Sequence, residues 1–139
     1  MPELAYDDIK TGDEASLTRT ITDADIVNFA ELTGDMNPVH LDAEYAAKST
    51  FGKRIAHGML MAGLVSAVLG MQLPGPNSNY LGQDLKFTAP VKIGDTVKVV
   101  VTVTEKRDDK RTIKLRTTAS NQRGEMVIDG TAAVKKLGL

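Results

Sequence analysis

The amino-acid sequence predicts an α+β fold in which an antiparallel β-sheet is wrapped around one long, central apolar helix. The first observation is the segment 58–73, which contains no Asp, Glu, Lys or Arg. As a helix it would be about 24 Å long at 1.5 Å per residue, and a membrane span needs roughly 18 or more apolar residues. The second observation is the run of four β-like segments that follows it, 79–91, 96–107, 111–122 and 125–136. A soluble helix that is apolar on all sides must be surrounded by protein, and these strands can cover it.

The part of the chain before the central helix is predicted to hold one strand and two helices. Residues 12–20 alternate loosely between apolar and polar types, which predicts a short strand. Thr22 and Asp25 have the spacing of a capping box, and the apolar positions that follow favour a helix over 23–33 that ends at Gly34. Asp42 is placed to cap a short helix over 43–48, and residues 49–57 are expected to form a loop.

The strands after the central helix are predicted from alternation and from turn residues. Val97, Val99, Val101 and Val103 alternate with polar residues, and so do Ile113, Leu115 and Thr117. The segments 108–110 and 123–124 have the composition of hairpin turns. Consecutive hairpins give antiparallel pairing, so the sequence predicts a curled antiparallel sheet.

Composition excludes several classes of protein. The 139 residues are expected to form one domain, 1–139, and 42% hydrophobic with 25% charged residues is ordinary for a globular protein. A net charge of −1 gives no bias towards nucleic acid or acidic membranes. The chain has no cysteine, and its first residues lack the pattern of a signal peptide, so a cytoplasmic protein is expected. Its two histidines are 17 positions apart, which argues against a metal site.

The segment Gly34-Asp35-Met36-Asn37-Pro38-Val39-His40 is the strongest candidate for a functional site. Pro38 lacks an N–H and favours an extended conformation at Asn37, so Asp35 and His40 are not expected to share one helix. A sharp turn would bring the carboxylate and the imidazole to one point, where they can perform general acid–base chemistry on a water molecule. Local spacing leaves a structural alternative open, in which Asp35 ends a helix and His40 packs.

Three segments together resemble a known family. They are the motif at 34–40 with its surroundings, Ile55-Ala56-His57-Gly58-Met59-Leu60, and the stretch 80–87 followed by Pro90-Val91 and Gly94-Asp95. In this order they resemble the MaoC-like, or hydratase 2, family of (R)-specific enoyl-CoA hydratases. The resemblance covers nearly the whole chain and implies the hotdog fold, which has the architecture described above.

The resemblance also implies roles for individual residues. Asp35 and His40 would be the catalytic pair that holds one water, with Asp35 as the main base. The backbone N–H of Gly58, at the start of the central helix, would stabilise the enolate oxygen. Asn37 is expected to brace the turn, and Ser66 to support substrate binding. No cofactor is expected, because coenzyme A is part of the substrate.

Three further residues have less defined expectations. His57 could cap the helix, contact the ligand or pack, and a structural role is expected. Lys53 and Arg54 form the basic pair nearest the expected pocket and are candidates to meet the phosphates of coenzyme A. Leu69, as a bulky residue near Ser66, favours a shallow tunnel and short acyl chains.

The function implied by the resemblance is reversible, (R)-specific hydration of trans-2-enoyl-CoA to (R)-3-hydroxyacyl-CoA. Such an enzyme links fatty-acid β-oxidation to polyhydroxyalkanoate precursors. The alternatives are a (3R)-hydroxyacyl-ACP dehydratase and a non-catalytic acyl-CoA-binding hotdog protein; a hotdog thioesterase is disfavoured by the motif at 34–40. Open sheet edges and the family both indicate a homodimer.

Overall fold

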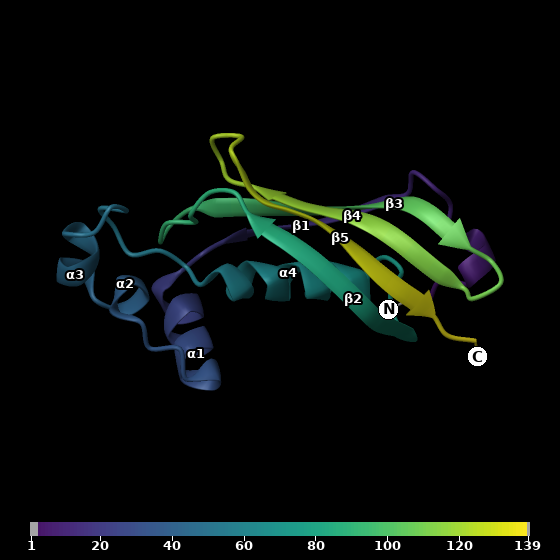
Figure 1. Cartoon of the computed structure of the whole chain (residues 1–139), viewed down its shortest axis with the longest axis horizontal. Helices are drawn as coiled ribbons and strands as arrows, with labels where there is room; N and C mark the ends of the chain where they lie inside the picture. Colours follow the sequence, from purple (N-terminus) through teal and green to yellow (C-terminus); the bar gives the residue numbers. More distant parts are fainter. Residues whose placement is uncertain (1–2, 139) are drawn as a thin grey trace.

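A computed structural model describes residues 3–138 and contains the predicted antiparallel sheet packed on one central helix (Figure 1). The helices are η1 (Tyr6–Asp8), α1 (Asp23–Thr33), α2 (Pro38–Leu41), α3 (Ala43–Ala47) and α4 (Gly58–Met71). The strands are β1 (Glu14–Thr20), β2 (Ser78–Phe87), β3 (Thr96–Arg107), β4 (Thr112–Ser120) and β5 (Met126–Lys136). All neighbours pair antiparallel, in the order β1-β3-β4-β5-β2.

Each predicted helix and strand is present, whereas the short helices η1 and α2 were not predicted. Several predicted ends differ by one or two residues, and the end of β2 differs by more. The strand predicted over 79–91 ends at Phe87. The Thr88 N–H still bonds to the Val127 carbonyl, the next position in the β2–β5 register, and Pro90 has no N–H with which to continue the pairing. The helix predicted over 58–73 ends at Met71, where the N–H groups of Gln72 and Leu73 both turn back to the carbonyl of Val68.

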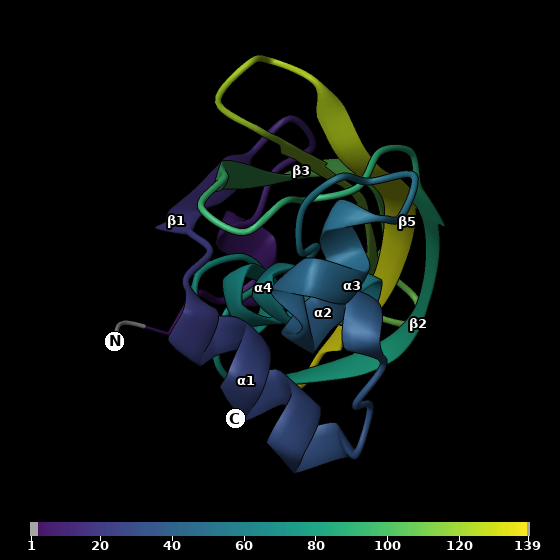
Figure 2. The same ribbon diagram turned by 90° about the vertical axis from the view of Figure 1, so that its left-hand side faces the viewer.

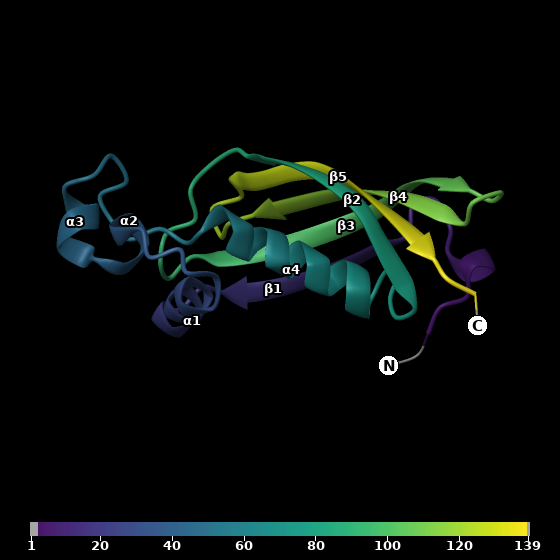
Figure 3. The ribbon, with the colours of Figure 1, turned by 60° about the horizontal axis from the view of Figure 1, so that its bottom comes forward.

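The sheet curves around α4, which lies along its concave face (Figures 2 and 3). Met61, Val65, Val68 and Leu69 point into the core and are at most 2% exposed. The opposite side of α4 is not covered by this chain: Met59 is 61% exposed, and Gly63, Ser66 and Gly70 are exposed as well. The expectation that the chain alone surrounds the helix is therefore wrong for this side.

Helices α1 to α3 gather at the end of the sheet where α4 begins, and the described ends of the chain lie at the opposite end (Figure 1). The capping box predicted at Thr22 and Asp25 is present, and Gly34 ends α1 in the left-handed conformation at φ 82°. Asp42 caps α3 by accepting the N–H groups of Glu44 and Tyr45. Within residues 3–138, none of the helices has the length and apolar character required to cross a bilayer.

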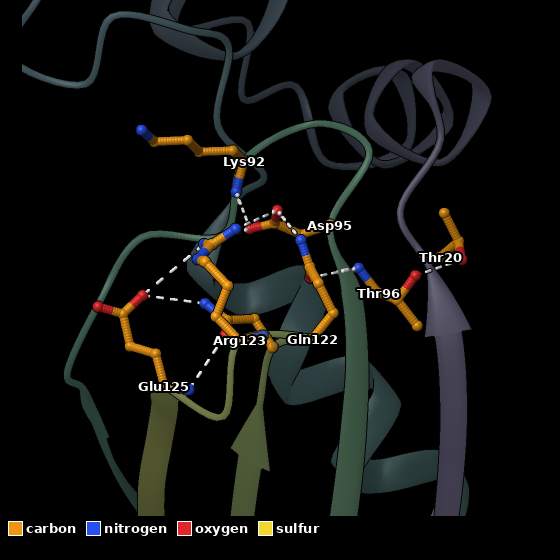
Figure 4. A network of polar contacts seen from close by, with 8 residues as sticks. Thr20, Lys92, Asp95, Thr96, Gln122, Arg123 and Glu125 are labelled. Atoms are coloured by element: carbon orange, nitrogen blue, oxygen red, sulfur yellow. Dashed lines mark hydrogen bonds and ion pairs between the residues drawn. The ribbon is translucent and has the colours of Figure 1, made fainter.

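A polar network joins the turn between β4 and β5 to the segment that leads into β3 (Figure 4). Asp95 is 5% exposed and accepts hydrogen bonds from the Lys92 N–H and the Gln122 amide, both at 3.0 Å. The Arg123 guanidinium lies 3.4 Å from the same carboxylate. Burial alone would raise the pKa of the Asp95 carboxyl, but these donors together lower it below its ordinary value.

Candidate active site

The turn between α1 and α2 brings Asp35 and His40 together without placing them on one helix, as predicted. Asp35 follows the end of α1, while His40 lies in the four-residue helix α2 that begins at Pro38. Asn37 caps α2, because its side chain accepts the Val39 N–H at 3.2 Å. The Asp35 carboxylate accepts the Asn37 N–H at 3.3 Å and lies within 4.8 Å of a ring nitrogen of His40. One water can bond to both groups across this distance, because each such bond spans about 2.8 Å.

His40 is held by two neighbours from the loop before α4. It is 8% exposed, and its Nδ1 lies 2.8 Å from the carbonyl oxygen of Ile55. A carbonyl only accepts, so Nδ1 carries the proton, and in the neutral ring Nε2 is left as an acceptor. The Arg54 Nε–H donates to the backbone carbonyl of His40 at 2.6 Å, and an Arg54 Nη1–H donates to Asp23 at 2.6 Å.

His57 also lies in the site. Its ring stacks on His40 with centroids 3.8 Å apart, and its Nε2 lies 3.0 Å from the carbonyl oxygen of Asp35. It precedes α4 but does not cap the helix with its side chain. Its Nδ1 is buried and has no hydrogen-bond partner among residues 3–138.

The two histidines thus meet despite their separation in sequence. Asp35, His40 and His57 offer ligand atoms that all lie within 4.8 Å of one another. The sequence argument against a shared metal site, which relied on the separation of 17 positions, is therefore wrong as an argument. Each ring already directs one nitrogen to a carbonyl oxygen, which leaves one lone pair per neutral ring.

Gly58 begins α4 directly beside these residues. Its N–H is one of the first helical donors, and no acceptor within residues 3–138 bonds to it. The ring of Phe87 lies so close that a Cβ on Gly58 would be 2.9 Å from a ring atom. A side chain at position 58 would therefore require the half-exposed Phe87 ring to move.

Two cavities meet at Asp35, Met59 and Phe87. The first, of about 510 Å³, also reaches His40, His57 and Gly58 and extends to the segment 88–91. The second, of about 830 Å³, follows the exposed side of α4. Its other lining residues are Phe29, Thr33, Ala62, Gly63, Ser66, Tyr80, Gln83 and Leu85.

The structure places the remaining predicted residues as follows. Ser66 lines the second cavity, whereas Asn37 lies outside the lining of both. Leu69 is 2% exposed in the core and lines neither cavity, so it gives no support for a shallow tunnel. Arg54 is engaged with His40 and Asp23 rather than free for a phosphate, while Lys53 is exposed.

Sequence reasoning missed several residues that build the site. The carbonyl of Ile55 orients His40, and the rings of Phe29 and Phe87 form cavity walls. A backbone carbonyl has no signal in the sequence. The segment 55–58 did stand out in sequence, but its contacts with 35–40 depend on the fold.

Comparison with known proteins places the chain among relatives of similar length. The MaoC like domain family matches residues 7–124. An (R)-specific enoyl-CoA hydratase of Rhodospirillum rubrum is 51% identical over 129 residues, covering 93% of this chain and 89% of that protein. A 3-hydroxybutyryl-CoA dehydratase of Methylorubrum extorquens is 48% identical, with 97% and 87% covered. An (R)-hydratase structure from A. caviae, involved in PHA biosynthesis, has a TM-score of 0.91 at 43% identity, with 93% and 98% covered, which confirms the hotdog fold.

Proposed function

Because the chain belongs to the MaoC-like domain family, we propose that it is an (R)-specific 2-enoyl-CoA hydratase, a hydro-lyase. The reaction adds water across the double bond of trans-2-enoyl-CoA to give (R)-3-hydroxyacyl-CoA, and it is reversible. The observation that carries the proposal is the carboxylate of Asp35 within 4.8 Å of the His40 ring, beside the free first N–H of α4. The R configuration comes from the relatives.

The acid–base pair holds and activates one water. Both the Asp35 carboxylate and the unprotonated Nε2 of His40 accept hydrogen bonds, so the water donates to both and keeps a lone pair for attack on C3. Asp35 takes the proton as the C3–O bond forms, and His40 orients the water. A proton returned from the pair to C2 completes the addition, so that the hydroxyl group and the proton of the added water enter from one face.

The thioester oxygen takes up negative charge while C2 awaits its proton. The Gly58 N–H, at the positive end of the α4 dipole, donates to this oxygen. Ser66 lines the second cavity and supports the acyl group. Asn37 contributes by capping α2 rather than by contact with substrate.

The second cavity is the proposed acyl site, because it is the larger and runs along the apolar helix from Asp35 to Ser66. Short acyl chains are proposed as substrates on the strength of the 3-hydroxybutyryl-CoA dehydratase relative. The relative involved in PHA biosynthesis supports a role in supplying polyhydroxyalkanoate precursors.

A homodimer is part of the proposal. The exposed side of α4 and the unpaired edge of β2 lie next to each other, and Met59, Met71, Leu81 and Phe87 are each more than half exposed there. A second copy would cover both the apolar helix side and the strand edge. Light scattering after size exclusion should give twice the chain mass of 14.9 kDa; a monomer at micromolar concentration would refute this part.

The activity is tested by following loss of the conjugated enoyl absorbance of crotonyl-CoA and resolving the product enantiomer. Asp35→Asn and His40→Gln should each lower kcat by about 100-fold or more, as expected for lost acid–base groups. Asp109→Asn is the matched control, because Asp109 is an exposed carboxylate in the β3–β4 turn. A folded wild-type protein that hydrates neither crotonyl-CoA nor longer enoyl-CoA esters would contradict the proposal; activity confined to the ACP thioester would favour the dehydratase alternative.

A further inference from the structure

His57 contacts both members of the acid–base pair, although it is not itself one of them. Its Nε2 lies 3.0 Å from the Asp35 carbonyl oxygen, and its ring stacks on His40 with an interplanar angle of 27°. The ring of Phe29 packs against it with centroids 4.7 Å apart. His57 is 2% exposed, so these contacts fix the ring on several sides.

The hydrogen bonds define which nitrogen of each ring carries its proton. The Asp35 carbonyl can only accept, so Nε2 of His57 is the protonated nitrogen, whereas His40 is protonated at Nδ1 towards Ile55. The neutral His57 ring is then left with an unprotonated, buried Nδ1 that no residue within 3–138 satisfies. An unpaired buried acceptor lowers stability. A purely apolar aromatic side chain would pack here without that cost, so packing alone does not account for a histidine.

We propose that His57 is a positioning residue of the hydration reaction. Its Nε2–H fixes the backbone of Asp35, and its ring fixes the plane of His40, so the two acceptors meet on one water. Because His57 directly precedes Gly58, it also fixes the position of the acid–base pair relative to the N–H that stabilises the enolate. This inference rests on the proposed function and adds to it a residue that exchanges no proton with the substrate.

Two substitutions separate the contributions of His57. His57→Phe keeps an aromatic ring for stacking but removes the donor to Asp35. His57→Gln keeps an amide donor near the Nε2 position but removes the ring. We expect His57→Phe to lower kcat for crotonyl-CoA by about 10- to 100-fold with KM changed less than about threefold, since misplacement of reacting groups has effects of this size. His57→Gln should recover at least threefold in kcat over His57→Phe.

A core variant controls for general loss of stability. Leu115 is 0% exposed on β4 and lies outside both cavity linings, so Leu115→Ala should lower Tm without selective loss of kcat. Wild-type kcat in folded His57→Phe would overturn the proposal. The proposal would also be overturned if His57→Phe and His57→Gln lost the same kcat, and if the relation between their loss of kcat and their loss of Tm were the one that Leu115→Ala shows.

Imidazole 15N NMR provides a readout that needs no substrate. The chain contains only two histidines, so His57→Phe assigns both sets of signals. We expect His40 as the Nδ1–H tautomer and His57 as the Nε2–H tautomer, with the His40 signals shifted or averaged between tautomers in His57→Phe. A wild type without hydratase activity would overturn the proposed function. An Nδ1–H tautomer of His57, or unchanged His40 signals in His57→Phe, would overturn the positioning role even in an active enzyme.

Discussion

Substitution of Arg54 tests whether the loop before α4 holds His40 in place. Arg54 is mostly buried, with its side chain 14% exposed, and it makes two 2.6 Å contacts, to the His40 carbonyl and to Asp23. Asp23 is 66% exposed, so the ion pair should contribute less than about 1 kcal/mol. The partly buried bond from a charged donor to the His40 carbonyl should contribute about 1.5–3 kcal/mol.

Arg54→Met should therefore lower the free energy of unfolding by about 2 kcal/mol, or Tm by roughly 6 °C for a chain of this size. Asp23→Asn removes only the ion pair and should cost less than about 1 kcal/mol. Urea unfolding followed by circular dichroism measures both, and kcat for crotonyl-CoA should fall in Arg54→Met but not in Asp23→Asn. Equal destabilisation by the two variants would refute the view that the bond to the His40 carbonyl dominates.

Three further predictions test the fold away from the site. Gly130→Ala would put a Cβ 2.0 Å from the backbone oxygen of Asp84 and should lower the free energy of unfolding by roughly 3 kcal/mol, because β2 must move away from β5. Gly82 faces open space, so Gly82→Ala should be nearly neutral. Equal urea midpoints for the two variants would contradict this. Burial and the hydrogen bond to Asp108 raise the pKa of Tyr6 to about 12. The stability that this shift provides is present below about pH 10 and should fall by roughly 2 to 3 kcal/mol as the pH rises through 12; urea titrations of Tyr6→Phe should lack this loss. The hydrogen-bond donors around Asp95 lower its pKa, so the stability that its carboxylate provides is present above the ordinary carboxyl pKa of about 3.9 and is lost as the pH falls further. The difference in unfolding free energy between wild type and Asp95→Asn should therefore narrow below about pH 4. A difference that does not depend on pH would contradict the role of the network.

Elements with local chemical signals were predictable from the sequence. The helix α1 runs over the predicted residues, because Thr22 with Asp25 and then Gly34 mark its two ends by side-chain and backbone chemistry. The predicted ends of α4 and β2 ran too far, because apolar residues continue after both elements. Leu73 is buried beyond the end of α4, and Val91 is buried beyond the end of β2. Burial and regular secondary structure thus end at different positions, and composition reports only burial.

In the candidate site, too, the features set by a short segment could be predicted and the contacts set by the fold could not. Asp35 and His40 are five positions apart with a proline between them, so their approach is a property of a short segment and could be predicted. Residues 54–57 supply the partners of His40 and Asp35. Arg54 and His57 donate to the backbone carbonyls of His40 and Asp35, the carbonyl of Ile55 accepts from the His40 ring, and the His57 ring stacks on it. These contacts depend on where the loop before α4 crosses α2, and no local pattern encodes that crossing.

One pentapeptide, 54–58, contacts both members of the acid–base pair and supplies the N–H proposed for the enolate. Arg54 donates to the backbone carbonyl of His40, and the carbonyl of Ile55 accepts from the His40 ring. The N–H of Ala56 donates to the carbonyl of Val91 in the wall of the first cavity. The last two residues of the segment supply the stacked imidazole and the free N–H of α4. A shift of this backbone would therefore displace the water site and the enolate site together.

This shared dependence predicts non-additive substitutions. Arg54→Met and His57→Phe both release His40, so once one is present the second should cost less. The double variant should lose less kcat/KM than the product of the single losses, with a coupling of about 0.5–3 kcal/mol in transition-state free energy. Arg54→Met combined with Leu115→Ala is the control pair, because Leu115 lies in the β4 core away from the cavity linings and its effect should add. Additive losses in both pairs would mean that Arg54 and His57 act on separate features, and the segment would not be a single positioning element.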